Sequence, residues 1–152
     1  MYYRQKKYAL AIKDYEKALN IDPNNAAAYI NRGIAYSSLP KPEYQQAIED
    51  YQKALNIDSN NTEAYINRGI AYSGLGEHET AIKDYDDAIR IAPNNADAYY
   101  AKAFTQTLIE GKKQEAIENY RQAAKLYQEQ NKPKYSENTL KKIEELSASE
   151  SP

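Results

Sequence analysis

The chain of 152 residues has no cysteine and no tryptophan, and it holds one phenylalanine, one methionine and one histidine. Without cysteine there is no disulfide framework, no thiolate metal ligand and no cysteine nucleophile, so the redox compartment stays undefined. Valine is absent, and glycine occurs only five times. Strands favour β-branched residues and hairpins usually need glycine turns, so these absences disfavour a β-rich fold. We therefore expect an all-helical protein.

Strong charge and long apolar runs are also missing. The formal net charge is -2, and the sequence has no cluster of basic residues that could neutralise phosphates. We therefore expect no nucleic-acid partner. No apolar run approaches the roughly 20 residues that cross a bilayer, and the first residues do not form a signal peptide. We expect a soluble, cytoplasmic protein with no membrane insertion.

Tyrosine and alanine are abundant instead, and tyrosine alone occurs 16 times. Leucine, isoleucine, valine and phenylalanine together make up about a sixth of the chain, a share that by itself hints at disorder. The balanced charge argues against disorder, because self-repulsion is weak. The core must then be built from alanine and tyrosine.

The sequence repeats itself at intervals of about 35 residues. Residues 28–37 recur without change as residues 64–73. A second block, residues 11–15, returns in similar form at residues 47–51, 81–85 and 116–120. Turn segments rich in asparagine separate the units, where an asparagine can cap the following helix. Each unit is therefore predicted to be helix, turn, helix, turn.

Small residues recur opposite tyrosines in these units. Gly33 and Gly69 each stand inside a predicted helix, where glycine costs roughly 1 kcal/mol relative to alanine. Their recurrence therefore indicates a role in packing, because a glycine lets a partner helix approach closely. We expect a bulky side chain at either position to force the helix pair apart.

At these columns the chain resembles the tetratricopeptide repeat (TPR) family. In the repeat of residues 62–95, the positions of the family pattern are Tyr65, Arg68, Gly69, Tyr72, Ala81, Tyr85, Ala88 and Pro93. The resemblance implies a right-handed α-solenoid of stacked antiparallel helix pairs, with a concave groove lined by the first helix of each pair. It also implies a non-enzymatic scaffold that binds a peptide or a segment of another protein.

The repeat pattern predicts one TPR domain over residues 1–147. It consists of a half repeat (1–25), three full repeats (26–61, 62–95 and 96–130) and a capping helix (132–147), followed by a disordered tail (148–152). The half repeat contains only a second-type helix, roughly residues 3–20, whose apolar face lacks its partner. The capping helix is predicted to carry Tyr135, Thr139, Leu140, Ile143 and Leu146 on one side.

The residues of the first helices that are not needed for packing form the predicted groove. Isoleucine pairs one helical turn apart would give an apolar ribbon, and asparagine amides beside it would hold a peptide backbone. In some TPR relatives an asparagine ladder at the places of Asn31 and Asn67 has this role. The candidate groove residues are Ile30, Asn31, Ile34, Ser37, Ile66, Asn67, Ile70, Ser73, Tyr100 and Phe104. The alternative is that the isoleucines pack between neighbouring repeats and that the asparagine side chains are exposed to solvent.

Other charged columns have structural interpretations. The family's carboxylate clamp needs cations, but Ile30, Ile34, Asp97 and Ala101 occupy the matching places. Glu63 and Asp97 favour a neutral or basic ligand. The cationic column Arg32, Arg68 and Lys102 is predicted to pair with the recurring aspartates rather than bind an anion. His78 takes the place of a tyrosine in its column and is predicted to pack.

The sequence contains no constellation for catalysis, no metal site and no cofactor motif. Three other interpretations stay open. The chain can self-associate through its unpartnered first helix as a dimer or an end-to-end array, or it can be an excised domain of a larger protein. It can also bind RNA, as another class of helical repeat does, although it lacks that class's sequence pattern.

Overall fold

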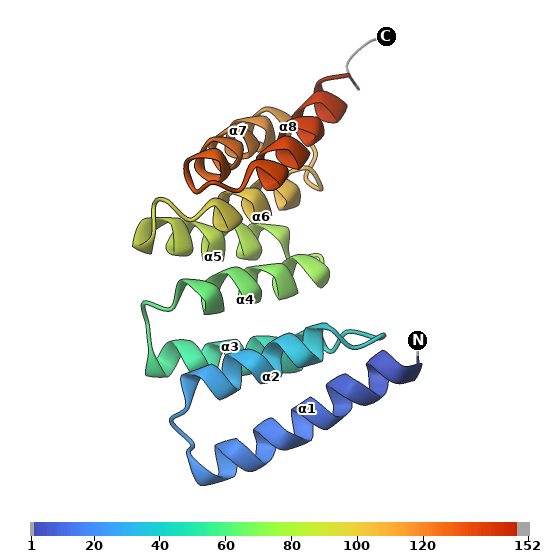
Figure 1. Ribbon diagram of the computed structural model, residues 1–152, viewed down its shortest axis with the longest axis vertical. Helices are drawn as coiled ribbons and strands as arrows, with labels where there is room; N and C mark the ends of the chain where they lie inside the picture. The colour runs from blue at the N-terminus through green and yellow to red at the C-terminus, as the bar shows by residue number, and fades with distance from the viewer. Residues whose placement is uncertain (1, 149–152) are drawn as a thin grey trace. The chain divides into compact units, whose positions relative to one another are not determined.

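The computed structural model describes residues 2–148, which are helical throughout apart from short turns (Figure 1). Within this range the helices are α1 (Tyr2–Ile21), α2 (Ala26–Ser37), α3 (Tyr44–Ile57), α4 (Thr62–Gly74), α5 (His78–Ile91), α6 (Ala96–Gln106), α7 (Lys113–Glu129) and α8 (Pro133–Ala148). The predicted all-α fold class is confirmed. The tail predicted to be disordered lies, from residue 149 on, outside the described residues.

The helices follow the predicted repeat order. α1 stands in the place of the half repeat, α2 to α7 in the places of the three full repeats, and α8 in the place of the capping helix. The chain divides into two compact units: Met1–Glu77 holds α1 to α4, and His78–Pro152 holds α5 to α8. This division falls inside the predicted repeat 62–95, so the assignment of residues 1–147 to one domain stays a prediction.

Asparagine side chains start the first helix of each full repeat. The Oδ1 atoms of Asn25, Asn61 and Asn95 accept hydrogen bonds of 2.9, 3.0 and 3.1 Å from backbone N–H groups three residues later. The first N–H groups of a helix have no partner inside it, so these bonds fix where α2, α4 and α6 begin. The capping role predicted for the turn asparagines is confirmed.

Alanine and tyrosine do form the core. Tyr51, Tyr85 and Tyr120 stand at one column of α3, α5 and α7, and each is 1% exposed. The alanines one helical turn before and after each tyrosine are fully buried. These alanines are Ala47, Ala54, Ala81, Ala88, Ala116 and Ala123.

Gly33 shows why a glycine recurs inside the first helix. A methyl group placed on Gly33 would lie 2.6 Å from Cε1 of the Tyr51 ring, closer than van der Waals contact allows. The Tyr51 ring of α3 therefore lies directly against the backbone of α2 at Gly33. The packing role predicted for Gly33 is confirmed. Gly69 occupies the matching place on α4 and is buried.

The capping helix α8 buries only part of the side that the sequence predicted. Ser136 and Thr139 are buried, whereas Tyr135 is 58% and Leu140 is 49% exposed. The buried stripe follows the spacing of residues 136, 139 and 143, and the two exposed side chains lie on its flanks. Of the residues predicted on one side of this helix, Thr139 is buried, Ile143 and Leu146 are half-buried, and Tyr135 and Leu140 are exposed.

Candidate functional site

α2 and α4 carry the same residue block and place the candidate groove residues of the first unit. On α2, Asn31 is exposed and Ile34 is half-buried. On α4, Asn67 is half-buried and Ile70 is 46% exposed. Both helices contact α3, which lies between them in the chain. The two copies therefore present related side chains within one unit.

A hollow of about 250 Å³ brings four of the predicted residues together. Its wall contains Ile34, Ser37, Asn67 and Ile70. Three residues outside the predicted set, Ser38, Tyr44 and Tyr51, complete the lining. The sequence assigned both tyrosines to packing columns, and repeat position gave no signal that they also border an opening.

The hollow is rich in hydrogen-bonding groups and has no charged side chain. The Ser37 hydroxyl oxygen is buried beside the Tyr51 hydroxyl. The Asn67 side chain lines the hollow, and the Asn31 side chain is exposed. Burial raises the pKa of Tyr51 to about 12, while the hydrogen-bonding interaction with the Ser37 hydroxyl lowers it. The phenol therefore stays protonated at neutral pH.

The remaining candidates of the first unit do not line this hollow. Ile30 is 5% exposed and belongs to the core that α2 forms with α3 and α4. It offers almost no surface to a ligand, so its assignment to the groove is not supported. Ile66 and Ser73 are half-buried on α4.

Tyr100 and Phe104 lie on α6, in the second unit. The Tyr100 ring packs edge-on against Tyr120 of α7, with ring centroids 5.2 Å apart. Phe104, one helical turn further along, is 51% exposed. Near the start of α6, Asp97 accepts a 2.6 Å hydrogen bond from the Tyr127 hydroxyl, and burial together with this carboxylate raises the pKa of Tyr127. Phe104 is thus the more accessible of the two predicted contacts.

Arg32 is tied into the fold. Its Nε and Nη2 atoms donate to the two carboxylate oxygens of Asp50 at 2.7 and 2.6 Å. The exposed fractions of the two side chains are 14% and 3%, and the aspartate raises the pKa of the guanidinium. The guanidinium carbon also lies 5.7 Å from the centre of the Tyr29 ring. The predicted pairing of arginine with aspartate is confirmed here.

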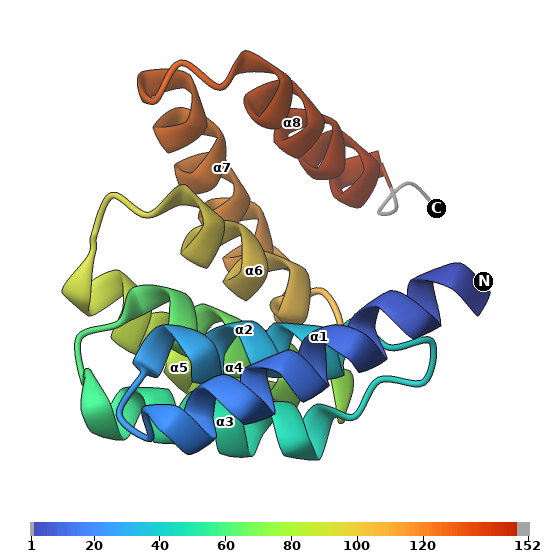
Figure 2. The same ribbon diagram turned by 60° about the horizontal axis from the view of Figure 1, so that its bottom comes forward.

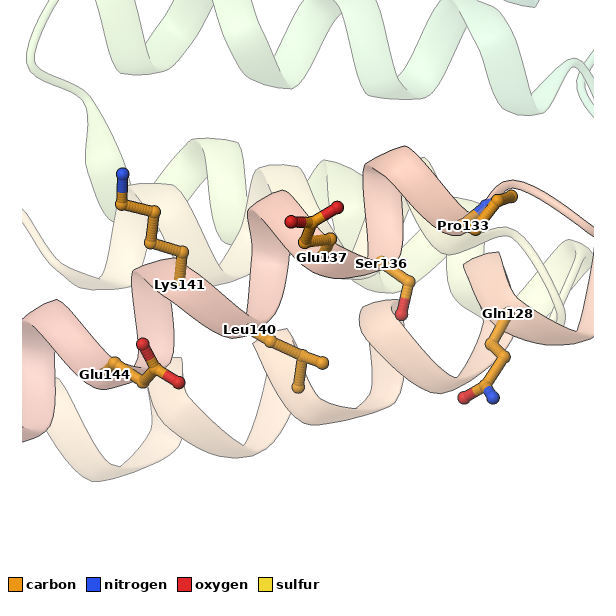
Figure 3. Close-up of a pocket in the computed structure, with 7 residues that line it drawn as sticks. All are labelled: Gln128, Pro133, Ser136, Glu137, Leu140, Lys141 and Glu144. Carbon is orange, nitrogen blue, oxygen red and sulfur yellow. The ribbon is translucent and has the colours of Figure 1, made fainter.

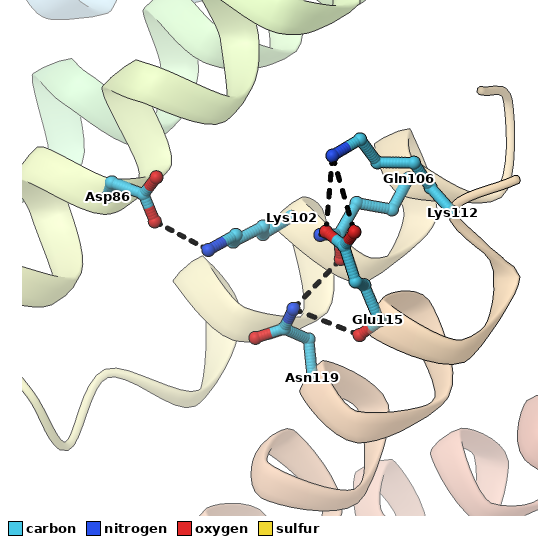
Figure 4. Close-up of polar contacts among 6 residues, drawn as sticks. All are labelled: Asp86, Lys102, Gln106, Lys112, Glu115 and Asn119. Atoms are coloured by element: carbon cyan, nitrogen blue, oxygen red, sulfur yellow. Dashed lines mark hydrogen bonds and ion pairs between the residues drawn. The ribbon is translucent and has the colours of Figure 1, made fainter.

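The other cations of the column also make polar contacts within the fold. Arg68 donates to the side-chain oxygen of Gln52 and lies over the Tyr65 ring. Lys102 bonds to Asp86 at 2.6 Å, as Figure 4 shows. In the fourth repeat, Asn119 takes the place of the aspartate and donates to the side chain of Gln106 at 2.8 Å (Figure 4). These contacts favour a structural role over anion binding.

Two larger hollows lie elsewhere. One of about 620 Å³ runs beside α8 and is lined by Gln128, Pro133, Ser136, Glu137, Leu140, Lys141 and Glu144 (Figure 3). The other, of about 730 Å³, lies in the first unit and includes Ile12 and Glu16 of α1 with Tyr36 and residues 39–41 and 43. Charged residues with long, flexible side chains line both of these hollows. Neither is lined by any of the predicted groove residues.

The described residues show neither a metal-binding cluster nor a helix long and apolar enough to cross a membrane. No group of three or more histidine, aspartate or glutamate side chains converges within residues 2–148.

Comparison with known proteins agrees with the geometry. A TPR repeat model matches residues 1–39 and 42–76, and tetratricopeptide repeat models match residues 62–95 and 84–134. No curated protein sequence gives a significant match. Several solved structures share the fold.

Three of these structures illustrate the likeness. MamA is 25% identical with a TM-score of 0.71, over 95% of this chain and 91% of its own. The TPR domain of Arabidopsis OM64 is 33% identical with a TM-score of 0.64, over 70% and 87% of the two chains. The first TPR of Spaghetti (RPAP3), bound to the HSP90 peptide SRMEEVD, is 24% identical with a TM-score of 0.69, over 84% and 96%. The chain belongs to the tetratricopeptide repeat family.

Proposed function

We propose that this chain is a non-enzymatic interaction scaffold that binds an extended segment of another protein. The binding surface is the hollow on α2, α3 and α4, lined by Ile34, Ser37, Asn67 and Ile70 with Tyr44 and Tyr51. The observation that carries the proposal is that one uncharged hollow brings together four residues of the predicted groove, from two helices that carry the same sequence block.

The chemistry of the hollow fits a peptide backbone. An asparagine amide both donates and accepts, so Asn67 can pair with a peptide group whatever side chain follows it. Ile34 and Ile70 give apolar contact on either side of this amide. Asn31, exposed on the same helix as Ile34, extends the polar surface by a helical turn.

The ligand is expected to be neutral or basic. The first TPR of Spaghetti holds a peptide that ends in acidic residues. In this chain the lining of the hollow contains no cation, and Arg32 is already paired with Asp50. An acidic peptide terminus would therefore lose its hydration without gaining a partner. We expect micromolar affinity, about -8 kcal/mol, because a hollow of this size buries few side chains.

The test uses peptides selected by the protein itself. A library of random 12-residue peptides is panned against the full chain, and the dissociation constant of a selected peptide is measured by fluorescence anisotropy. The double variant Asn31→Ala with Asn67→Ala should weaken binding about tenfold or more, because hydrogen bonds to the peptide backbone are lost. Helicity should stay unchanged, since alanine has a higher helix propensity than asparagine.

A matched control changes the same residue type outside the hollow. Asn56 is an exposed asparagine on α3, bonded only to Gln52 among the interactions of its side chain. Asn56→Ala should leave the dissociation constant within twofold of the original. If the double variant binds the peptide as tightly as the original chain does, the hollow is not the ligand site.

A further inference from the structure

Each of the two tyrosines that line the hollow lies against a glycine of a neighbouring helix. Figure 2 shows α3 beside both α2 and α4 in the first unit. The Tyr51 ring lies on Gly33 of α2. The Tyr44 ring lies on Gly74 of α4, where an added methyl group would be 2.5 Å from Cζ of the ring. Contacts with the backbone of both flanking helices therefore hold the tyrosine part of the lining in place.

The polar groups of the hollow differ in how far a ligand can reach them. The Ser37 hydroxyl oxygen is buried and interacts with the Tyr51 hydroxyl, and the Tyr51 side chain is 1% exposed. This pair forms the closed part of the lining. Ser38, Tyr44 and Asn67 are half-buried, so a ligand that enters can contact them. Each of these three side chains can both donate and accept a hydrogen bond.

The rest of the hollow is apolar, and the hollow is small. Ile34 and Ile70 stand at the same column of α2 and α4, so each helix gives the lining one isoleucine. The volume of about 250 Å³ lies below the roughly 300 to 1,000 Å³ of pockets that hold drug-sized ligands. The hollow therefore suits one side chain of a peptide rather than a whole helix. The combination of lining groups fits a side chain with an apolar stem and an uncharged polar end.

We propose that the hollow receives one amide side chain of the ligand, a glutamine or an asparagine. The two isoleucines pack against its methylene groups, and the hydroxyl groups of Ser38 and Tyr44 bond to its carboxamide, which both donates and accepts. Asn67 stays available for the peptide backbone next to this residue. The assignment rests on the proposed function and names the residue that the ligand inserts.

Charged and apolar side chains fit this hollow less well. A glutamate or a lysine would lose its hydration, and the lining offers it no opposite charge. A methionine of similar length would cover the hydroxyl groups of Ser38 and Tyr44 without giving them a hydrogen-bond partner. Basic residues of the ligand are therefore expected next to the hollow rather than inside it.

Four short peptides test the choice of side chain. In each peptide, alanine and glycine flank one central residue on both sides, the two ends are blocked, and the central residue is glutamine, methionine, glutamate or lysine. Each peptide is titrated into the full chain, labelled for NMR, and the shifts of the backbone amide signals are measured. The glutamine peptide should bind with a dissociation constant of roughly 1 mM, because it is small, and should shift signals of residues that line the hollow. The other three should bind at least about fivefold more weakly.

Removal of hydroxyl groups identifies the residues that select the side chain. Tyr44→Phe keeps the ring on Gly74, and together with Ser38→Ala it should bring the glutamine and methionine peptides to within about twofold of each other. Binding of the methionine peptide should change little, whereas a general loosening of the hollow would weaken both peptides alike. The control is Tyr72→Phe with Ser147→Ala, the same changes outside the lining, which should keep the preference for glutamine.

Two results would overturn this inference alone. One is a glutamine peptide that binds no more tightly than the methionine peptide, and the other is an unchanged preference in the Tyr44→Phe with Ser38→Ala variant. Neither result decides the proposed function, which the selected peptides and the Asn31→Ala with Asn67→Ala variant test separately. Signal shifts of the glutamine peptide confined to residues outside the hollow would overturn both, because the hollow would then not be a binding site.

Discussion

The ion pair of Arg32 with Asp50 gives a sharp test of how the repeats are held together. The two side chains form a bidentate pair with distances of 2.6 and 2.7 Å, and Asp50 is 3% exposed. With an effective dielectric constant of about 20, unit charges about 4 Å apart attract by about 4 kcal/mol. Removing only the arginine loses this attraction and leaves a buried carboxylate without its partner. We therefore expect Arg32→Met to lower the free energy of unfolding by about 3 to 5 kcal/mol.

Urea unfolding at pH 7, followed by circular dichroism, measures this loss. The double variant Arg32→Met with Asp50→Leu should recover most of it, because no charge is then left buried. Asp14 supplies the control, since it stands at the same column of α1 and is 74% exposed. Asp14→Leu should change stability by no more than about 0.5 kcal/mol. A loss below about 1 kcal/mol for Arg32→Met, or a double variant no more stable than the single one, would refute the reasoning.

Three further predictions concern packing, capping and titration. Gly33→Leu should destabilise the chain by about 1 to 3 kcal/mol in urea unfolding, because the new side chain meets the Tyr51 ring. Asn25→Ala should cost about 1 kcal/mol in the same assay, since α2 loses the bond that its Oδ1 accepts. Burial raises the pKa of both Tyr51 and Tyr85 to about 12, above the ordinary value of 10.0. The folded chain keeps these protons while the unfolded chain loses them, so stability should be intact below pH 10 and fall between about pH 10 and 12. Urea unfolding at a series of pH values checks this, and the Tyr51→Phe variant should show a smaller fall.

The repeated columns made most of the fold predictable from sequence. A tyrosine that recurs with alanines one turn away in several copies reveals a buried stripe, and Tyr51, Tyr85 and Tyr120 are buried as expected. The asparagine caps were predictable for the same reason, because Asn25 and its copies precede each first helix. These features depend on local sequence and on the partner helix of the same repeat.

Burial of individual groove residues was less predictable. Ile30 and Ile66 stand in identical sequence blocks, yet Ile30 is 5% exposed and Ile66 is half-buried. The difference comes from which helices surround each copy, and this information is not contained in the repeated block itself. A repeat pattern therefore predicts which positions pack within a repeat more reliably than it predicts how exposed each residue is.

The unusual core composition also shapes the chemistry of the candidate binding surface. With phenylalanine in place of Tyr44 and Tyr51, the opening beside Ser37 would lose two of its hydroxyl groups. Here Tyr44 and Tyr51 pack against helices and also border the hollow, so their rings fill space while the Tyr51 hydroxyl stays protonated at neutral pH. A tyrosine hydroxyl that enters a buried site needs a polar environment, which small hydroxyl residues such as Ser37 and Ser38 provide. The shortage of large aliphatic residues, which first suggested disorder, thus leads to an uncharged hollow with several hydrogen-bonding groups, on which the proposed binding of a peptide backbone rests.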